Sequence, residues 1–509
     1  MAADLLVETS EPSDRPASNP PSSPPTAAAT IGNLISESAI YGLAKILDPM
    51  IGFALLSVIT AILTPSDYGR IRLFTHTSAI VFTLGSLGIH QSFLRFFTAA
   101  PDESTRRSIA GTAITLSIFY WVVLLPVGLV LARPIATTWF DSAQPAWVYL
   151  LLALALVETL DALGCNLLQA SGRAWSFLFA TVLNTILVRT FAVGLILGGS
   201  GAWGWVTGET IGRMIAAAMI LMIAMRGVRL RTNRTDAAEL SWYGLMLVPA
   251  MLSFYIMSIT DTFLMRYLIP DYLPALGYYG VGERIATIMH MGNMAIILGW
   301  QRFAFGNMHR DDGGDVIGYG LFLYCVAAGF VALGLTLLGD DLMHWVIDES
   351  FAAGLTVILP LTGAALAGGL ANMCDVGLHR QKKPHIISGV TTAAAVTNIA
   401  LNFYTIPRYG FVGAAYATFI AQVFRLVAIF VVSQNVFRIP IPRRTMAVAG
   451  YYATLFVIGK TLDPLGWILS GALQTLLVAA APIGLWLLPI WTGDERGEVR
   501  SRLPFVGGK

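Results

Sequence analysis

Long apolar runs follow one another along most of the chain, separated by short turns that carry polar or charged residues. A helix of roughly 20 mostly apolar residues is needed to cross ~30 Å of hydrocarbon. The pattern predicts fourteen such segments, at 35–61, 70–98, 108–132, 147–170, 175–198, 202–225, 242–268, 276–305, 316–338, 353–378, 385–405, 411–436, 446–462 and 466–490. Because no intervening segment is long enough to fold as a domain, we expect an all-α polytopic membrane protein of about 14 transmembrane helices.

The first twelve predicted spans contain an internal duplication. Matching positions recur at offsets of 201 to 211 residues: Tyr41-Gly42-Leu43 with Tyr243-Gly244-Leu245, Ser57 and Thr60 with Ser258 and Asp261, Tyr68-Gly69 with Tyr279-Gly280, Gln91 and Arg95 with Gln301 and Arg302, and Gly201 and Gly204 with Gly410 and Gly413. Since each unit holds an even number of spans, both copies enter the membrane from the same side, and such parallel repeats bind substrate at their interface.

The duplication predicts two six-helix lobes around a central cavity, followed by two C-terminal helices. The expected boundaries are 1–30 for a disordered cytoplasmic tail, 31–225 for the N-lobe, 226–437 for the C-lobe, 438–491 for spans 13 and 14, and 492–509 for a second cytoplasmic tail. The first 30 residues are rich in Pro, Ser and Ala and lack an apolar period, as in disordered tails. They also lack the basic start and apolar run of a secretory signal.

Composition supports the membrane assignment and narrows the function. The chain has 509 residues, of which 56% are hydrophobic and 12% charged, so its apolar surface exceeds what one soluble core could bury. A net charge of +2 gives no reason to expect nucleic acid as a partner. The three cysteines lie in apolar segments without a spacing pattern, which supports neither a disulfide framework nor a metal site.

The positions of Lys and Arg predict the orientation in the membrane. With the N-terminus inside, most basic loop residues fall on the cytoplasmic side, where positive residues are retained. The outer loops hold only four basic residues, Arg70, Arg133, Arg408 and Lys460. One outer loop is strongly acidic and contains Asp340, Asp341, Asp348 and Glu349. We therefore expect a multi-pass protein of the bacterial inner membrane with both termini in the cytoplasm.

Charged residues recur inside the predicted spans, although the third, ninth and fourteenth spans have none and can face lipid. A charge at the bilayer centre costs at least ~2.5–3.5 kcal/mol, so these residues are expected to line a wet cavity or to pair across it. Lys45 with Asp48 and Glu209 with Arg213 have helical spacing and could neutralise each other. Arg95 and Arg302, near the cytoplasmic ends of their spans, would anchor the helices at the headgroups or bind substrate phosphates.

Acidic residues in the spans are candidates for binding a coupling ion. Asp261 has no basic residue three or four positions away, so it needs a partner from another helix, a bound cation or a proton. Glu158 and Asp161 are three residues apart, and like charges that close raise one pKa. Either site could exchange H⁺ or Na⁺, or could be structural. Two more residues complete the candidates: Asp48 in the first span, which is equivalent to the seventh, and Asp375 in the tenth, which is equivalent to the fourth.

Two prolines interrupt equivalent spans. Pro49 lies in the first span and Pro249 in the seventh, and each removes one backbone hydrogen bond from its helix. Both helices are expected to bend. The bend could be a static kink or a moving hinge.

Two stretches carry a family resemblance. They read YGLAKILDPMIGFALLSVITAILTPSDYG in the first span and TDTFLMRYL followed by LGYYGVGERIATI in the seventh and eighth. They resemble the Wzx-type polysaccharide flippases of the multidrug, oligosaccharidyl-lipid and polysaccharide (MOP) exporter superfamily. The resemblance covers spans one to twelve. It implies two six-helix lobes around a cationic cavity and translocation of undecaprenyl-diphosphate-linked oligosaccharide, an O-antigen or exopolysaccharide repeat unit, from the cytoplasmic to the periplasmic leaflet.

The resemblance gives the intramembrane arginines a role, because guanidinium groups bind diphosphates well. The candidates are Arg189, which is best placed by depth, Arg95, Arg213, Arg302 and Arg425. No cofactor is expected beyond H⁺ or Na⁺ as a coupling ion. The expected partners are the lipid-linked oligosaccharide, membrane lipids, and a polysaccharide polymerase with its chain-length proteins.

Two other classes of protein fit the pattern less well. A cation-coupled drug or metabolite exporter of the same superfamily would favour an acidic cavity, and the arginines count against it. A membrane glycosyltransferase or polymerase would need a sizeable catalytic outer loop, which the sequence lacks. No phosphate-binding glycine loop, nucleophile triad or metal cluster is found, so we expect a transporter and no enzyme.

Overall fold

The computed structural model describes residues 42, 44 and 47–491, except 229, 231, 309, 340, 342–345 and 382. Both predicted tails, 1–30 and 492–509, and Lys45 lie outside this range. The helices are α2 (Leu56–Ile62), α3 (Pro65–Ser86), α4 (Ile89–Ala99), α5 (Glu103–Val130), α6 (Ala132–Trp139), α7 (Ala146–Ala170), α8 (Ala174–Leu197), α9 (Gly201–Ala224), α10 (Arg234–Leu268), α11 (Tyr272–Asn307), α12 (Gly313–Leu337), η1 (Glu349–Val357), α14 (Ile358–Cys374), α15 (Val376–Arg380), α16 (Pro384–Val436), α17 (Arg443–Thr461), η2 (Asp463–Leu465) and α18 (Trp467–Leu487). No strand occurs among the described residues.

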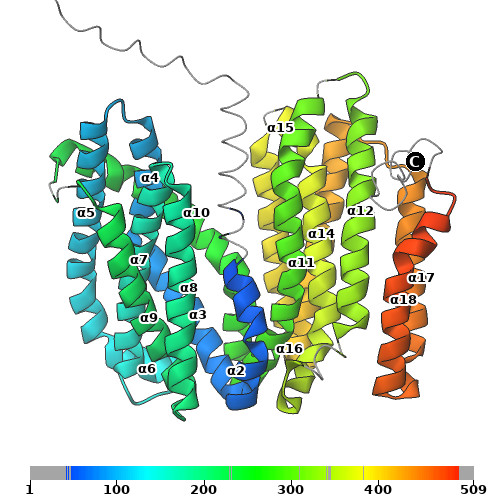
Figure 1. Cartoon of the computed structure of the whole chain (residues 1–509), viewed down its shortest axis with the longest axis horizontal. Coiled ribbons are helices and arrows are strands. Elements are labelled where there is room, and N and C mark those ends of the chain that lie inside the picture. Colours follow the sequence, from blue (N-terminus) through cyan, green and yellow to red (C-terminus); the bar gives the residue numbers. More distant parts are fainter. Residues whose placement is uncertain are drawn as a thin grey trace, which may run out of the picture.

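The helices form two bundles that stand side by side (Figure 1). One contains α2 to α9, the other contains α11 to α16, and α17 with α18 packs against the outside of the second through α12. The predicted all-α fold with two lobes and two C-terminal helices is therefore confirmed. We call the end of the molecule with the α4–α5 turn the inner end and the end with α6 the outer end, following the predicted orientation.

Local sequence signals explain where the helices begin and break. Thr64 and Asp67 form a reciprocal capping box at the start of α3, with Pro65 at the first helical position. The predicted span 70–98 is divided into α3 and α4, because Leu87 and Gly88 both adopt left-handed backbone conformations. Gly410 has φ +60° within α16 and separates the two predicted spans that α16 contains.

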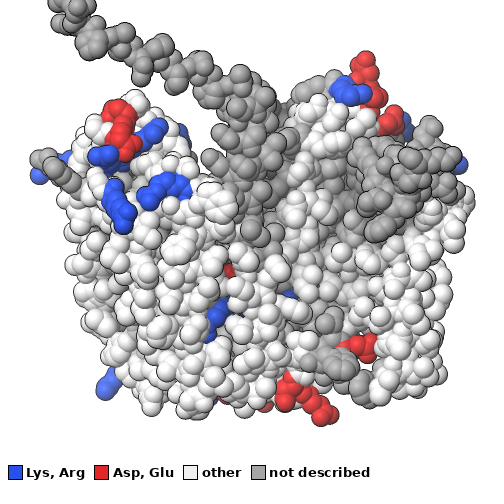
Figure 2. Space-filling view, viewed as in Figure 1, with Lys and Arg blue, Asp and Glu red and all other residues white. Residues whose placement is uncertain are grey.

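Eight of the described helices are long and apolar enough to cross a bilayer. Figure 2 shows most charged side chains gathered near the two ends of the molecule, with a broad, mostly uncharged band between them in which a few charged groups are visible near the centre. The charge-free third span forms α5, which exposes large apolar side chains such as Phe119, Val122 and Val130, as a lipid-facing helix does. The chain is a multi-pass membrane protein. The count of fourteen spans and the domain boundaries remain predictions.

Glycines allow the two lobes to touch at both ends. At the outer end, α3 meets α11 so closely that a Cβ on Gly69 would lie 1.9 Å from the Leu273 carbonyl oxygen. A Cβ on Gly277 would lie 2.0 Å from the Pro65 carbonyl oxygen. Towards the inner end, a Cβ on Gly88 would lie 2.4 Å from the carbonyl oxygen of Gly244 in α10. Small residues of this kind let membrane helices approach backbone to backbone.

Candidate functional site

A cavity of about 310 Å³ lies between the two lobes, lined by the first span, α3, α8, α9 and α11. Its charged residues are four arginines and three carboxylates: Arg72, Arg189, Arg213, Arg284, Asp48, Glu209 and Glu283. We call it the central cavity. It contains two of the five arginines predicted to bind substrate, Arg189 and Arg213, and one predicted coupling-ion residue, Asp48.

Arg189 and Arg284 converge in this cavity from opposite lobes. A Cβ placed on Gly52 would lie 3.5 Å from Arg284 Nη1 and 3.9 Å from Arg189 Nη2. Arg189 also donates to Asp48 Oδ1 at 3.0 Å, and its Nε is buried without a hydrogen-bond partner in the described part of the chain. Two guanidinium groups facing one point that lacks a side chain form a favourable place for an anion. Asp48 forms an ion pair with Arg189 of α8, a different helix.

Arg72 of α3 forms an ion pair with Glu283 of α11. The Arg72 side chain is only 7% exposed, and its Nε donates to Thr262 Oγ1 at 3.1 Å. His76 Nδ1 also lies 2.9 Å from Thr262 Oγ1. The two paired residues are 211 positions apart, the same offset that relates Tyr68 to Tyr279 in the duplication. Equivalent positions of the two repeats therefore bind each other across the interface between the lobes.

Asp261 finds its partners on neighbouring helices, one of the alternatives that the sequence left open. Its carboxylate accepts hydrogen bonds from Tyr279 Oη at 2.8 Å, Thr418 Oγ1 at 2.7 Å and Asn402 Nδ2 at 2.7 Å. Asn398 extends the cluster, because it donates to Thr418 and accepts from Asn402. The Tyr279 ring lies 4.9 Å from the Arg72 guanidinium carbon, so this cluster adjoins the pair between the lobes.

A second acidic cluster lies inside the N-lobe, on α7 and α9. Arg213 is 3.2 Å from Glu209 and 4.0 Å from Glu158, and Ser78 donates to Glu158 at 3.0 Å. Asp161 accepts from Asn184 at 3.0 Å, and its other oxygen has no partner among the described residues. The predicted pairing of Glu209 with Arg213 is confirmed. Within the part of the chain that the structure describes, Arg213 supplies the one guanidinium group near Glu158 and Asp161.

Packing of α9 against α8 fixes the position of this cluster. A Cβ on Gly208 would lie 2.4 Å from the Phe191 carbonyl oxygen, and one on Gly212 would lie 2.6 Å from the Leu187 carbonyl oxygen. Glycines four residues apart therefore bring the two helices into contact. Glu209 and Arg213 follow these glycines directly, so the same contact sets their place at the cavity.

A further cavity of about 580 Å³ lies within the C-lobe, and we call it the C-lobe slot. It shares Glu283 and Thr287 with the central cavity. Arg425, another arginine predicted to bind substrate, lines it and donates through Nη2 to Asn372 Oδ1 at 2.5 Å. Asp261 lines it as well.

The other predicted site residues lie elsewhere. Arg95 is exposed at the inner end, with its guanidinium carbon 4.3 Å from the Tyr243 ring centre, which fits an anchor better than a ligand for substrate. The side chain of Arg302 lies outside the described part. Asp375 follows α14 and has its Oδ2 3.7 Å from His379 Nε2. Pro49 lies in a helical stretch, residues 47–54, and Pro249 lies inside α10.

Three charged residues of the central cavity were not among the predicted site residues: Arg72, Glu283 and Arg284. All three lie inside predicted spans, 70–98 and 276–305. A signal for two of them was present, because the offset of 211 that aligns Tyr68 with Tyr279 also aligns Arg72 with Glu283. Opposite charges at equivalent intramembrane positions indicate a pair near the axis of the repeat.

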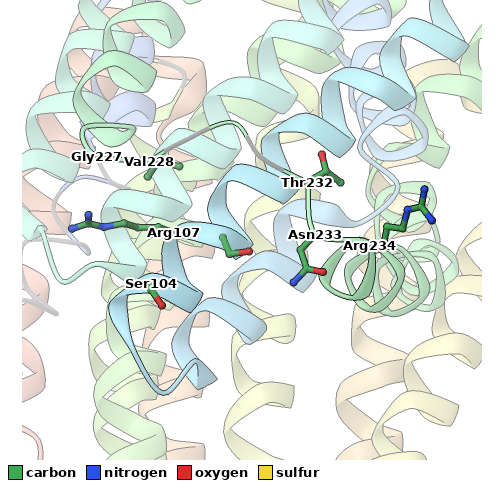
Figure 3. A pocket seen from close by; sticks show the side chains of 8 residues that line it. Ser104, Arg107, Gly227, Val228, Thr232, Asn233 and Arg234 are labelled. Atoms are coloured by element: carbon green, nitrogen blue, oxygen red, sulfur yellow. The ribbon is translucent and has the colours of Figure 1, made fainter.

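A wider depression of about 920 Å³ lies at the inner end, between the start of α5 and the segment that leads into α10 (Figure 3). Its arginines point away from each other: Arg107 lies on one side and Arg234 on the other. Arg107 is bound to Glu103 at 3.1 Å, and both side chains are more than half exposed. The depression therefore lacks the convergent charges of the central cavity.

Comparison with known proteins shows which proteins share this fold and which family model matches part of the chain. A family model described as polysaccharide biosynthesis protein matches residues 58–297. No curated protein matches the chain by sequence. A lipid II flippase MurJ in an inward closed conformation is 13% identical, with a TM-score of 0.65 over 88% of this chain and 98% of that chain. An inward-facing multidrug resistance MATE family transporter of the MOP superfamily is also 13% identical, with a TM-score of 0.59 over 80% and 99%.

A MATE structure in complex with MaL6 gives a TM-score of 0.53 at 15% identity, over 81% of this chain and 97% of that chain. These neighbours are a flippase and transporters, and none is named as an enzyme. These likenesses confirm the predicted fold, while membership of the MOP superfamily and the Wzx type remain predictions. The chain shares its fold with a lipid II flippase MurJ and with MATE transporters, and nearly half of it matches the model of the polysaccharide biosynthesis protein family.

Proposed function

We propose that the protein is a flippase for undecaprenyl-diphosphate-linked oligosaccharide. It would move an O-antigen or exopolysaccharide repeat unit from the cytoplasmic to the periplasmic leaflet of the bacterial inner membrane, without making or breaking a bond. The observation that carries the proposal is the convergence of Arg189 and Arg284 on Gly52 between the lobes. Diphosphate is the part of such a substrate that two guanidinium groups would bind.

The remaining charges of the central cavity suit reversible binding. Arg189 is held by Asp48 and Arg213 by Glu209, so both arginines have a resting partner that a diphosphate can replace. Such exchange avoids leaving a guanidinium group buried without a partner, which would be costly. Arg284 has no carboxylate within 4.0 Å in the described part of the chain, and its hydrogen-bond partner is the neutral hydroxyl of Tyr68, which a diphosphate can also replace.

Alternating access would use the contacts at the two ends of the lobes. Opening towards the outside requires α3 to leave α11 near Gly69 and Gly277, and opening towards the inside requires Gly88 to leave Gly244. Pro49 and Pro249 lie in helices on this path, and we propose that both act as hinges. The prenyl chain would stay in lipid throughout.

The direct test is deletion of the gene followed by measurement of the lipid-linked oligosaccharide on each leaflet. We expect the intermediate to accumulate on the cytoplasmic face, because synthesis continues while translocation stops. Re-expression of the wild-type chain should restore the periplasmic pool. An unchanged distribution between the leaflets would refute the proposal.

We propose that Asp261 holds a coupling cation, H⁺ or Na⁺. Its carboxylate lies among oxygen atoms from Thr418 and Asn398, and the buried Oδ1 of Asn402 has no hydrogen-bond partner among the described residues. Carboxylate, amide and hydroxyl oxygens are ligands for hard cations. The N-lobe cluster of Glu158, Asp161 and Glu209 around Arg213 is the second candidate, since it has an excess of negative charge that a proton would reduce.

The Asp261→Asn variant keeps the shape of the side chain and removes its charge. In proteoliposomes, we expect an inward Na⁺ or H⁺ gradient to increase the flipping rate of the wild type. The flipping rate of the variant should be the same with and without the gradient. Asp312→Asn, in the exposed pair with Arg310, is the control and should respond as the wild type does. A variant of Asp261 that still responds fully to both gradients would exclude this residue as the coupling site.

One observation favours the exporter as a second candidate. The three carboxylates of the N-lobe cluster could bind a cationic drug in addition to a proton. Binding measurements separate the two functions, because an exporter should bind organic cations and a flippase should bind undecaprenyl diphosphate. The arginines at Gly52 favour the second result.

A further inference from the structure

The C-lobe slot runs along the helices that enclose it. On α11 it is lined by Tyr279, Glu283, Thr287 and His290, which are spaced three to four residues apart on one helix face. At 1.5 Å per residue these positions extend over about 16 Å. The slot is therefore elongated from the outer towards the inner end, and it adjoins the central cavity at Glu283 and Thr287.

The two ends of the slot differ chemically. At the outer end Asp261 already accepts three hydrogen bonds. Arg425 lies seven residues further along α16 than Thr418, which places it about 10 Å nearer to the inner end. Its Nε is buried and has no hydrogen-bond partner among the residues that the structure describes. A donor without a partner in a cavity wall is available to a ligand.

Uncharged polar side chains accompany Arg425 at the inner end. Asn372, Gln422 and Thr391 line the slot beside it, and these amide and hydroxyl groups both donate and accept hydrogen bonds. Between them the wall consists of small residues, among them Ala394 and Ala421. Among the described residues that line it, the slot thus has hydrogen-bonding groups of both kinds and one guanidinium group, with the carboxylates of Asp261 and Glu283 towards its outer end.

We propose that the C-lobe slot binds the saccharide part of the substrate while the diphosphate is held at Gly52; this assignment rests on the proposed function. Sugar hydroxyls both donate and accept, and they match amide and hydroxyl side chains. A diphosphate needs more positive charge than Arg425 alone supplies, and a purely apolar ligand would leave the buried Nε of Arg425 without a partner. A volume of about 580 Å³ lies within the range of about 300–1,000 Å³ typical of small-molecule sites.

Substitutions that fill or strip the slot test this assignment. Full-length protein in lipid nanodiscs would be titrated with two probes: undecaprenyl diphosphate alone, and the undecaprenyl-diphosphate-linked oligosaccharide that accumulates in a deletion strain. Ala421→Phe should weaken binding of the oligosaccharide probe by about tenfold or more, the loss expected from one or two buried hydrogen bonds. Its affinity for undecaprenyl diphosphate alone should not change.

Gln422→Ala removes a polar group without adding volume, so it tests the slot even if Ala421→Phe fails to fold. We expect the same selective loss, of smaller size. Val427→Phe is the matched control, because Val427 lies on the same helix and is 54% exposed. Unchanged binding of the oligosaccharide probe, or an equal loss for both probes, would overturn the slot assignment. If the wild type binds neither probe, the proposed function fails and the slot assignment fails with it.

Discussion

Replacing Arg284 with alanine is expected to abolish surface polysaccharide while the amount of protein in the membrane stays normal. Arg284 approaches Gly52 from the C-lobe and has no carboxylate within 4.0 Å in the described part of the chain, so its removal takes a ligand from the diphosphate without leaving a paired carboxylate behind. The loss also removes a hydrogen bond to the buried Tyr68 hydroxyl. A charge-assisted hydrogen bond contributes ~1.5–3 kcal/mol, which corresponds to about 10- to 100-fold in affinity. Polysaccharide gels and immunoblots of membranes measure both quantities.

Arg189→Ala removes the arginine that the N-lobe contributes and should cause the same loss of surface polysaccharide. It also leaves Asp48 without its ion-pair partner. Arg284→Lys is expected to retain part of the activity, because an ammonium group keeps the charge and loses the bidentate geometry. Arg408→Ala removes an exposed arginine whose contacts among the described residues are with Tyr404 of its own helix, and it should have no effect. Normal polymer in both Arg284→Ala and Arg189→Ala would exclude the Gly52 region as the diphosphate site.

Replacing Glu283 with glutamine is expected to destabilise the protein strongly. Arg72 would keep its charge in a place where its side chain is 7% exposed, and removal of one partner from a buried ion pair costs ~3–5 kcal/mol. Because Glu283 itself is 40% exposed, the lower part of that range is the better expectation. Thermal unfolding of the purified protein in detergent should show a midpoint several degrees below that of the wild type.

The exposed pair of Arg107 and Glu103 gives a matched control. Both side chains are more than half exposed, so Glu103→Gln should change the free energy of unfolding by less than about 1 kcal/mol. The exchanged double variant, Arg72→Glu with Glu283→Arg, should recover part of the loss, since it restores opposite charges across the lobes. An unfolding midpoint for Glu283→Gln equal to that of Glu103→Gln would show that the pair of Arg72 with Glu283 does not stabilise the contact between α3 and α11.

The glycine contacts and the ion pair of Arg72 with Glu283 together explain why the lobes meet where they do. The glycine contacts at Gly69 and Gly277 bring α3 and α11 together, and the pair of Arg72 with Glu283 then lies one helical turn further along the same interface. Close packing buries the Arg72 side of the pair, which strengthens the ionic interaction, while Glu283 stays partly exposed to the cavity. Separation of α3 from α11 during outward opening must therefore replace this pair with other partners, such as water or substrate.

Much of the fold followed from the sequence. Apolar runs of about 20 residues located the helices, because the bilayer requires every backbone polar group to be paired within its own segment. The offset between Tyr68 and Tyr279 revealed the duplication and hence the two lobes. The high cost of intramembrane charge correctly indicated that Arg189, Arg213 and Asp48 line a cavity.

Only the tertiary structure decided which charged groups meet. Asp48 pairs with Arg189 from 141 positions away, and Asp261 is bound by Asn402 and Thr418 from a different part of the C-lobe. Helical spacing reports neighbours on one helix, whereas these partners come from helices whose rotation and depth are set by packing. Glycine contacts such as Gly208 against α8 fix that rotation, and a single sequence does not show which face of a helix they bring to its neighbour.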